Sequence, residues 1–111
     1  MQKPRIVFMG TPDFSVAILR ALVESNDYDI VAIVSQPDKP VGRKKQLLPT
    51  PIKTFGEQQK ITVYQPVRIR HEYEFMLALK PDLIVTCAYG QIVPKAVLDI
   101  PRYGCINERR N

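Results

Sequence analysis

The chain has no long hydrophobic run and few residues of the kinds that bind metals or form disulfides. No apolar run approaches the roughly 20 residues that a membrane-spanning helix needs, which argues against a transmembrane protein. The two cysteines, Cys87 and Cys105, lie in apolar surroundings without CxxC spacing or a nearby histidine. We therefore expect reduced thiols in a cytoplasmic protein, with neither a disulfide nor a metal site. Residues 1–4 lead straight into an apolar run, which predicts no signal peptide.

The common nucleotide-binding and catalytic motifs are also missing. Gly10 stands alone after the first apolar run, so there is no GxGxxG motif, and there is no P-loop. No Ser-His-Asp or Cys-His arrangement is visible either. The single histidine, His71, lies between Arg70 and Glu72 near the start of a predicted helix. A lone exposed histidine there is typical of a structural position, and we assign it no role.

The composition is sufficient for one folded domain. The 111 residues include 45% hydrophobic residues, which suits a single core rather than a disordered chain. The net charge of +5 permits a polyanionic partner without requiring one. Where the basic residues cluster is therefore more informative than their total.

Residues 5–25 form the stretch around which the rest of the chain is organised. Residues 5–9 are nearly all apolar and predict a strand buried on both faces. Thr11 is expected to cap the helix that follows, with Pro12 at its first position and Asp13 in its first turn. The predicted buried face of this helix consists of residues that recur at helical spacing, namely Phe14, Ala17, Ile18, Ala21 and Leu22.

Further apolar runs predict strands at residues 29–35, 61–64, 83–87 and 104–107, and the last of these is expected to be buried. Helices are expected to begin after Thr50, with Ile52 and Phe55 facing the core, and at residues 69–79, with Tyr73, Met76 and Leu77 inward. A short helix should run from Pro94 to Pro101. This alternation predicts an α/β fold, a Rossmann-like open and mostly parallel twisted sheet with helices on both faces. We expect the strand order 3-2-1-4-5.

The stretch from residue 36 to residue 50 is the least regular part of the chain. Residues 36–51 contain four prolines, and no apolar periodicity is present. Its basic residues outnumber its one acid, Asp38. A solvated surface loop would explain this composition, but a flexible arm that meets phosphates explains it better. The arm should leave the carboxyl end of the second strand, on the same rim as Gly10 and Thr11, where ligands of parallel sheets bind.

Four separated motifs together resemble methionyl-tRNA formyltransferases. They are IVFMGTPDFS at residues 6–15, QPDKPVGRKK at 36–45, AYGQIVP at 88–94 and YGCIN at 103–107. Their order and spacing fit the family over residues 5–107. Members of that family transfer a formyl group from 10-formyltetrahydrofolate to the amino group of methionine on initiator tRNA. The resemblance implies an incomplete formyltransferase fold, a cytoplasmic protein, initiator methionyl-tRNA and folate as ligands, and no metal or membrane partner.

The resemblance also implies a role for each part of the rim. Asn107 corresponds to the catalytic asparagine, whose amide can donate to the oxyanion formed on the formyl carbon. The implied folate-binding segment is Tyr89, Gly90, Gln91 and Ile92, which offers backbone groups to a pterin edge. The implied tRNA-contacting residues are Arg43, Lys44 and Lys45. The substrate rim is completed by Gly10, Thr11 and Phe14.

Beyond residue 107 the sequence departs from the family. Arg109 stands where the family has a histidine, and a guanidinium stays protonated at neutral pH. No counterpart of the catalytic aspartate follows. We therefore expect residues 1–107 to be the N-terminal part of a formyltransferase catalytic domain and residues 108–111 to be a polar tail from a truncated or frame-shifted coding region. Formyl transfer by this chain alone is not expected.

Two other functions remain open. One is another transferase that uses 10-formyltetrahydrofolate, and the second is a non-catalytic RNA-binding module. Full-length family members are expected to be monomeric, whereas an incomplete sheet exposes an apolar edge. Self-association of this chain is therefore expected.

Overall fold

A computed structural model describes residues 2–108 and contains one five-stranded sheet. Its strands are β1 (Arg5–Gly10), β2 (Asp29–Val34), β5 (Val63–Tyr64), β6 (Leu83–Cys87) and β7 (Cys105–Glu108). Their order in space is β5-β2-β1-β6-β7, and every pairing is parallel. The predicted order of five strands is therefore confirmed, and so is the α/β class.

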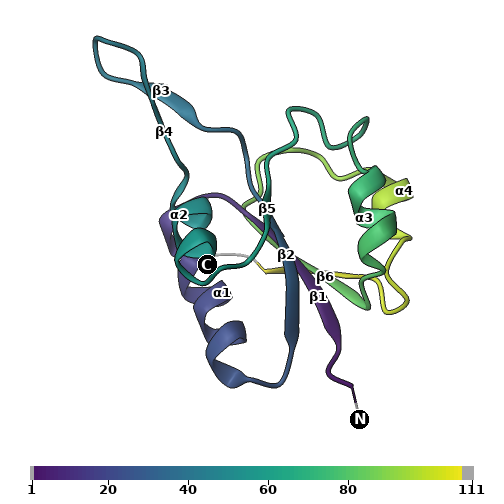
Figure 1. Cartoon of the computed structure of the whole chain (residues 1–111). Coiled ribbons are helices and arrows are strands. Elements are labelled where there is room, and N and C mark those ends of the chain that lie inside the picture. The colour runs from purple at the N-terminus through teal and green to yellow at the C-terminus, as the bar shows by residue number, and fades with distance from the viewer. Residues whose placement is uncertain (1, 109–111) are drawn as a thin grey trace.

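The helices cover both faces of this sheet. The helices α1 (Asp13–Ser25) and α2 (Pro51–Gln58) lie on one side, and α3 (Glu74–Leu79) and α4 (Lys95–Leu98) lie on the other (Figure 1). Successive side chains of β1 point to opposite faces. Ile6 and Phe8 accordingly join the core under α1 and α2, whereas Val7 and Met9 join the core under α3 and α4. β1 is therefore buried on both faces, as its almost continuous apolar run predicted.

The start of α1 differs from the prediction. Thr11 does not cap this helix, because Pro12 is the N-cap residue and makes no side-chain capping bond. The Thr11 hydroxyl instead donates to the carbonyl oxygen of Tyr89 at 2.6 Å. Tyr89 lies in the loop after β6, so this hydroxyl bonds to a neighbouring loop instead of capping α1.

The buried face of α1 was predicted correctly in part, since Phe14, Ile18 and Leu22 pack against the core. Ala17 and Ala21 are exposed, and the fully buried positions are Ser15 and Leu19. The small Ser15 side chain lets the helix approach the sheet closely, and its hydroxyl donates to the Cys87 carbonyl at 2.7 Å. Helix spacing alone did not reveal that a serine would be the innermost residue.

The second helix agrees with the prediction. The Thr50 side chain caps α2 by accepting a hydrogen bond from the Lys53 amide at 3.1 Å, and Ile52 and Phe55 are buried. Gly56 weakens helix propensity but is buried here. A Cβ at this position would lie 2.8 Å from both Ile33 Cδ1 and Val63 Cγ2. The sheet therefore requires glycine where the helix alone would not.

Two predictions for the second half of the chain need correction. The third helix begins at Glu74 rather than at residue 69, and Leu77 is 54% exposed although Met76 is buried. The last strand, β7, was expected to be buried but is an edge strand whose residues after Cys105 are exposed. β7 continues through Glu108, one residue past the predicted end of the catalytic-domain part at residue 107. That predicted domain boundary stays a prediction. Arg109 and the rest of the predicted polar tail lie outside the described residues.

The irregular stretch after β2 forms a hairpin. Its strands are β3 (Lys39–Val41) and β4 (Gln46–Leu48), paired antiparallel and projecting from the rim (Figure 1). Every residue of both strands is exposed, so the sequence carries no apolar alternation here. We call residues 39–48 the basic arm. In the part of the chain that the structure describes, no helix is long and apolar enough to cross a membrane.

Candidate functional site

The carboxyl ends of β1, β6 and β7 bring three predicted segments together. In the sheet register Gly10 pairs with Cys87 and Thr86 pairs with Asn107. The hydrogen bond from Thr11 to Tyr89 then joins the turn after β1 to the loop after β6. Asn107, Thr11 and Tyr89 therefore lie at the same end of the sheet, as the topology predicted.

A cavity of about 410 Å³ opens at this end of the sheet. Its size lies within the range of small-molecule sites in proteins. It is lined by a mixture of apolar and polar residues, namely Thr86, Ala88, Tyr89, Gln91, Val93, Leu98, Cys105 and Asn107. A larger hollow of about 520 Å³ lies at the opposite end, around Gln2, Lys3 and Arg5. The smaller cavity is the better candidate, because ligands of parallel sheets bind at the carboxyl ends of strands.

Asn107 presents its side chain from β7 to this cavity. The Thr86 hydroxyl donates to its Oδ1 at 2.9 Å, which fixes the orientation of the amide. Among residues 2–108, no acceptor contacts its Nδ2. The arrangement therefore leaves the Nδ2 amino group, with its two N–H donors, available for an oxygen in the cavity.

The loop after β6 has an unusual backbone. Ala88 has φ +52° and Gly90 has φ +104°. Glycine adopts positive φ without steric cost, whereas alanine does not. Such conformations persist where the surroundings enforce them, often at functional sites. Ile92, at the far end of the segment, is 93% exposed. The loop thus turns sharply above the sheet and presents backbone groups near the cavity.

The Tyr89 side chain belongs to the core rather than to the open cavity. It is 4% exposed, and among the described residues its hydroxyl has no hydrogen-bond partner. Burial, and secondly the nearby carboxylate of Glu72, raise the pKa of Tyr89 to about 12. The phenol therefore stays neutral at physiological pH.

Gln91 holds the loop in place through both ends of its amide. Its Oε1 accepts from the Ile69 amide at 2.7 Å, and its Nε2 donates to Gln36 Oε1 at 2.7 Å and to the Pro66 carbonyl at 3.1 Å. Gly90 packs against the same partner, since a Cβ there would lie 2.7 Å from Gln36 Nε2. The side chain of Gln91 is thus committed to structure.

The predicted rim residues of the first turn have different surroundings. A Cβ at Gly10 would lie 2.7 Å from Phe8 Cε1 and 3.0 Å from the Cys87 carbonyl oxygen, so only glycine fits. Thr11 bonds to the loop after β6, and Phe14 is half-buried against the core under α1. Thr11 and Pro12 also line a separate hollow of about 350 Å³ beside the basic arm.

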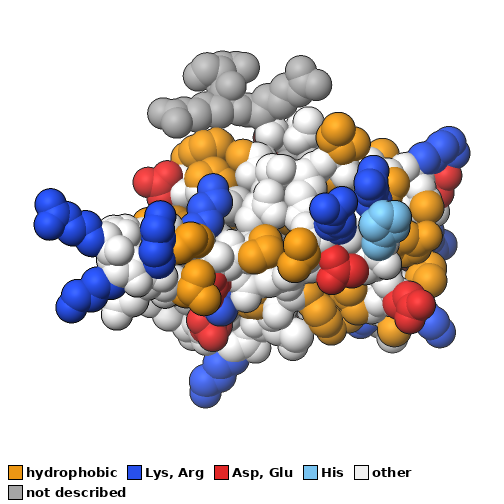
Figure 2. Space-filling model, turned by 90° about the horizontal axis from the view of Figure 1, so that it is seen from above, with side chains coloured by type: hydrophobic (Ala, Val, Ile, Leu, Met, Phe, Trp, Pro, Cys, Tyr) orange, Lys and Arg blue, Asp and Glu red, His pale blue; other side chains and the backbone are white. Residues whose placement is uncertain are grey.

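The three predicted cationic residues occupy the tip of the basic arm. Arg43 and Lys44 form the centre of a turn closed by a hydrogen bond from the Lys45 amide to the Gly42 carbonyl at 3.2 Å. Gly42 and Lys45 both have positive φ, and all four residues are exposed. Figure 2, viewed onto the carboxyl ends of the strands, shows Lys and Arg side chains projecting at the left, where the arm lies. The tip therefore presents its charges to solvent, away from the cavity.

The sequence as a whole now decides the family. A model of the formyl transferase family matches residues 4–108. This chain belongs to the formyl transferase family. It is 61% identical over 105 residues to a methionyl-tRNA formyltransferase of Bacillus thuringiensis subsp. konkukian (strain 97-27) and 60% identical over 105 residues to that of Bacillus cytotoxicus. Each match covers 93% of this chain and 33% of the relative, so the chain spans about one third of the length of these relatives.

The formyl transferase fold is also visible in a solved structure. The phosphoribosylglycinamide formyltransferase from Coxiella burnetii, determined in complex with CHES, superposes with a TM-score of 0.60. The match covers 96% of this chain and 51% of that chain, at 18% identity. At that identity the likeness shows the fold alone.

Some residues that line the cavity were not predicted from the sequence. Thr86 orients Asn107, and its only signal was a hydroxyl near the end of an otherwise apolar strand. Cys105 lines the cavity, and burial raises the pKa of its thiol. Within residues 2–108, no group of three or more His, Cys, Asp or Glu side chains is placed to hold a metal.

Proposed function

We propose that this chain is the amino-terminal, donor-binding part of a methionyl-tRNA formyltransferase. The proposed reaction transfers a formyl group from 10-formyltetrahydrofolate to the methionyl amino group of initiator tRNA. The observation that carries the proposal is Asn107, an oriented amide with an available N–H at a ligand-sized cavity. The identity to curated methionyl-tRNA formyltransferases supports the substrate class.

Asn107 would act by stabilising negative charge. Attack of the methionyl amine on the formyl carbon places charge on the formyl oxygen, and a preorganised amide donor lowers the energy of that state. Thr86 keeps the carbonyl end of the amide occupied, so its N–H end faces the reacting oxygen. Loss of one such donor typically lowers the rate by roughly 10²–10³-fold.

The cavity fits a folate-derived donor in size and chemistry. Val93 and Leu98 offer apolar contacts for a ring, and residues 88–92 turn with backbone polar groups near the opening. The proposed folate-binding residues are Tyr89, Gly90, Gln91 and Ile92, the first of them through its backbone. Such a wall holds a heteroaromatic edge without a dedicated charged side chain.

The basic arm would contact the tRNA. Arg43, Lys44 and Lys45 are exposed at its tip, and phosphate contacts by cations supply most nucleic-acid affinity. We propose that the chain works in the cytoplasm, where translation initiation takes place. Because Arg109 stands at the expected histidine position, we propose that the chain by itself binds both ligands without measurable formyl transfer.

The experiment is a titration of the ¹⁵N-labelled chain with 5-formyltetrahydrofolate, a stable analogue of the donor. We expect shifts in the Asn107 side-chain amide and in the backbone amides of residues 88–92. The variant Asn107→Ala should bind more weakly, whereas Gln58→Ala, at an exposed site of α2, should bind like the parent chain. Absence of shifts at the cavity would refute the donor-binding role.

The same samples separate the alternatives. Salt-dependent binding of tRNA with no response to the folate analogue would favour a non-catalytic RNA-binding module. Binding of the analogue without binding of tRNA would favour another folate-dependent transferase. Detection of N-formylmethionyl-tRNA would contradict the proposed inactivity of the isolated chain.

A further inference from the structure

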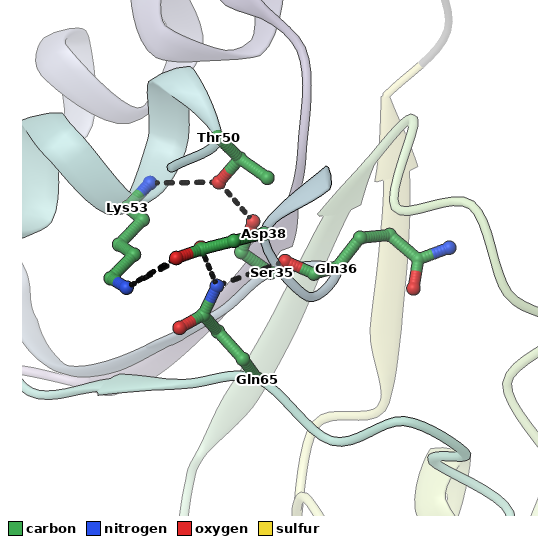
Figure 3. A network of polar contacts seen from close by, with 6 residues as sticks. All are labelled: Ser35, Gln36, Asp38, Thr50, Lys53 and Gln65. Carbon is green, nitrogen blue, oxygen red and sulfur yellow. Dashed lines mark hydrogen bonds and ion pairs between the residues drawn. The ribbon is translucent and has the colours of Figure 1, made fainter. Parts of the chain in front are cut away.

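Both ends of the basic arm are fastened to the body of the domain. At the returning end, the hydroxyl oxygens of Ser35 and Thr50 lie 2.5 Å apart in a buried hydrogen bond (Figure 3). Thr50 also caps α2 through the Lys53 amide. The base of the arm is therefore held, although its sequence suggested a flexible loop.

At the leaving end, Asp38 is held by two side chains. Lys53 Nζ lies 3.1 Å from one carboxylate oxygen, and Gln65 Nε2 donates to the other at 2.7 Å (Figure 3). These bonds, first that from Gln65 and then that from Lys53, lower the pKa of Asp38. The same Nε2 of Gln65 also donates to the Gln36 carbonyl at 3.1 Å. The Gln65 side chain therefore connects Asp38, at the base of the arm, to the backbone of Gln36.

Gln36 is the point where three loops of the rim meet. Its backbone N–H donates to the Thr11 hydroxyl at 3.3 Å, and that hydroxyl donates to the Tyr89 carbonyl. Its side-chain Oε1 accepts from Gln91 Nε2 at 2.7 Å. Gln36 thereby contacts the arm base, the turn after β1 and the loop after β6.

We propose that Gln36 is a positioning residue that couples the basic arm to the cavity loop at residues 88–92. A polyanion that orders the arm would then strengthen ligand binding in the cavity, and the reverse would hold by linkage. The chain of contacts runs from Asp38 through Gln65 and Gln36 to Gln91. Of these four residues, Gln91 is the one that lines the cavity. This inference rests on the proposed function for the identity of the two ligands.

The geometry explains why Gln36 rather than its neighbours would carry the coupling. Ser35 and Thr50 bond to each other and reach neither the turn after β1 nor the loop after β6. Lys53 reaches only Asp38 with its side chain. Gln36 alone among these residues bonds on one side to Gln65 and on the other to Gln91.

The test measures the affinity of the chain for 5-formyltetrahydrofolate with and without saturating initiator tRNA. We expect tRNA to strengthen that affinity by roughly 5-fold or more. The variant Gln36→Ala should bind each ligand alone but lose the enhancement. Gln36→Glu, which keeps an acceptor for Gln91 Nε2, should restore it, and Gln58→Ala should leave it intact. No enhancement in the parent chain, or full enhancement in Gln36→Ala, would overturn the inference.

A second readout works without either ligand. The Ile69 amide is protected by Gln91 Oε1, so its hydrogen exchange reports where Gln91 is held. Asp38→Ala should accelerate this exchange in the parent chain and have little effect in a Gln36→Ala background. Equal acceleration in both backgrounds, or none in either, would overturn the inference. If Ile69 responds as expected but no folate analogue binds, the proposed function fails while the coupling stands.

Discussion

The buried phenol of Tyr89 should make the stability of this chain sensitive to alkaline pH. The hydroxyl is enclosed in the core and has no hydrogen-bond partner among residues 2–108. An unsatisfied buried polar group costs about 1–3 kcal/mol. Replacement by phenylalanine removes this group and keeps the ring. We therefore expect Tyr89→Phe to raise the free energy of unfolding at pH 8 by about 1 kcal/mol.

The pKa gives the magnitude of the alkaline effect. Folding raises the pKa of Tyr89 from 10.0 to about 12, because burial disfavours the phenolate. The stabilising contribution is fully present below pH 10 and is lost as the pH rises toward the folded value. At pH 11 the unfolded phenol is mostly ionised and the folded one is not, which costs about 1 kcal/mol of stability. The loss should level off at about 3 kcal/mol above pH 12.

Urea unfolding at pH 8 and at pH 11 tests both numbers. Other tyrosines and the lysines also titrate in this range, so the relevant quantity is the difference between the parent chain and Tyr89→Phe. That difference should grow by about 1 kcal/mol between the two pH values. Tyr28→Phe, at a position 37% exposed, is the matched control for removal of a tyrosine hydroxyl outside the core. A Tyr89→Phe variant that is less stable at pH 8, or whose advantage does not grow with pH, would refute the reasoning.

Three further predictions concern the arm, its base and the second helix. Lys44→Ala should weaken RNA binding and lower the salt slope by about one unit, measured by titration at several salt concentrations. Folding lowers the pKa of Asp38, so the parent chain should lose stability as pH falls below about 4, whereas Asp38→Asn should not show this loss in acid titrations followed by circular dichroism. Gly56→Ala should destabilise the chain by about 1 kcal/mol in urea, because overpacking against Ile33 and Val63 exceeds the gain in helix propensity.

Each of these has a control and a contrary result. An unchanged salt slope for Lys44→Ala would remove the arm tip from the RNA contact. The exposed pair of Lys95 and Asp99 is remote from the arm, and Asp99→Asn should leave the acid transition attributed to Asp38 in place. Thr54→Ala, on the exposed face of α2, should stabilise slightly, and a similar gain for Gly56→Ala would contradict the packing argument.

The sheet could be predicted from the sequence because its strands carry their own signal. β1, β2 and β6 are largely buried, so each is a mostly apolar run. The connections contain helices, which forces parallel pairing and leaves few possible strand orders. The convergence of Thr11, Tyr89 and Asn107 follows from that topology.

The helix faces and the basic arm were harder to predict for a physical reason. Apolar spacing in α1 could not show that Ser15 would face the sheet, because the Cys87 carbonyl that receives its hydroxyl comes from distant sequence. The strands of the arm are exposed throughout, so no burial pattern marks them. Their pairing depends on a turn with positive φ at Gly42 and Lys45 and on the fastened base. Such contacts appear only when the chain is folded.

The contacts between the rim loops show what a motif can and cannot convey. Gln36 and Gln91 both lie in segments that resemble the family. Gln36 is in the motif that also holds the implied tRNA-contacting residues, and Gln91 is in the implied folate-binding segment. In the structure their side chains bond to each other at 2.7 Å, and the Gln91 side chain makes structural bonds. If the coupling experiment succeeds, these two glutamines connect the two ligand sites instead of belonging to one each. A substitution at either would then change the response to both ligands, although neither residue need touch the RNA.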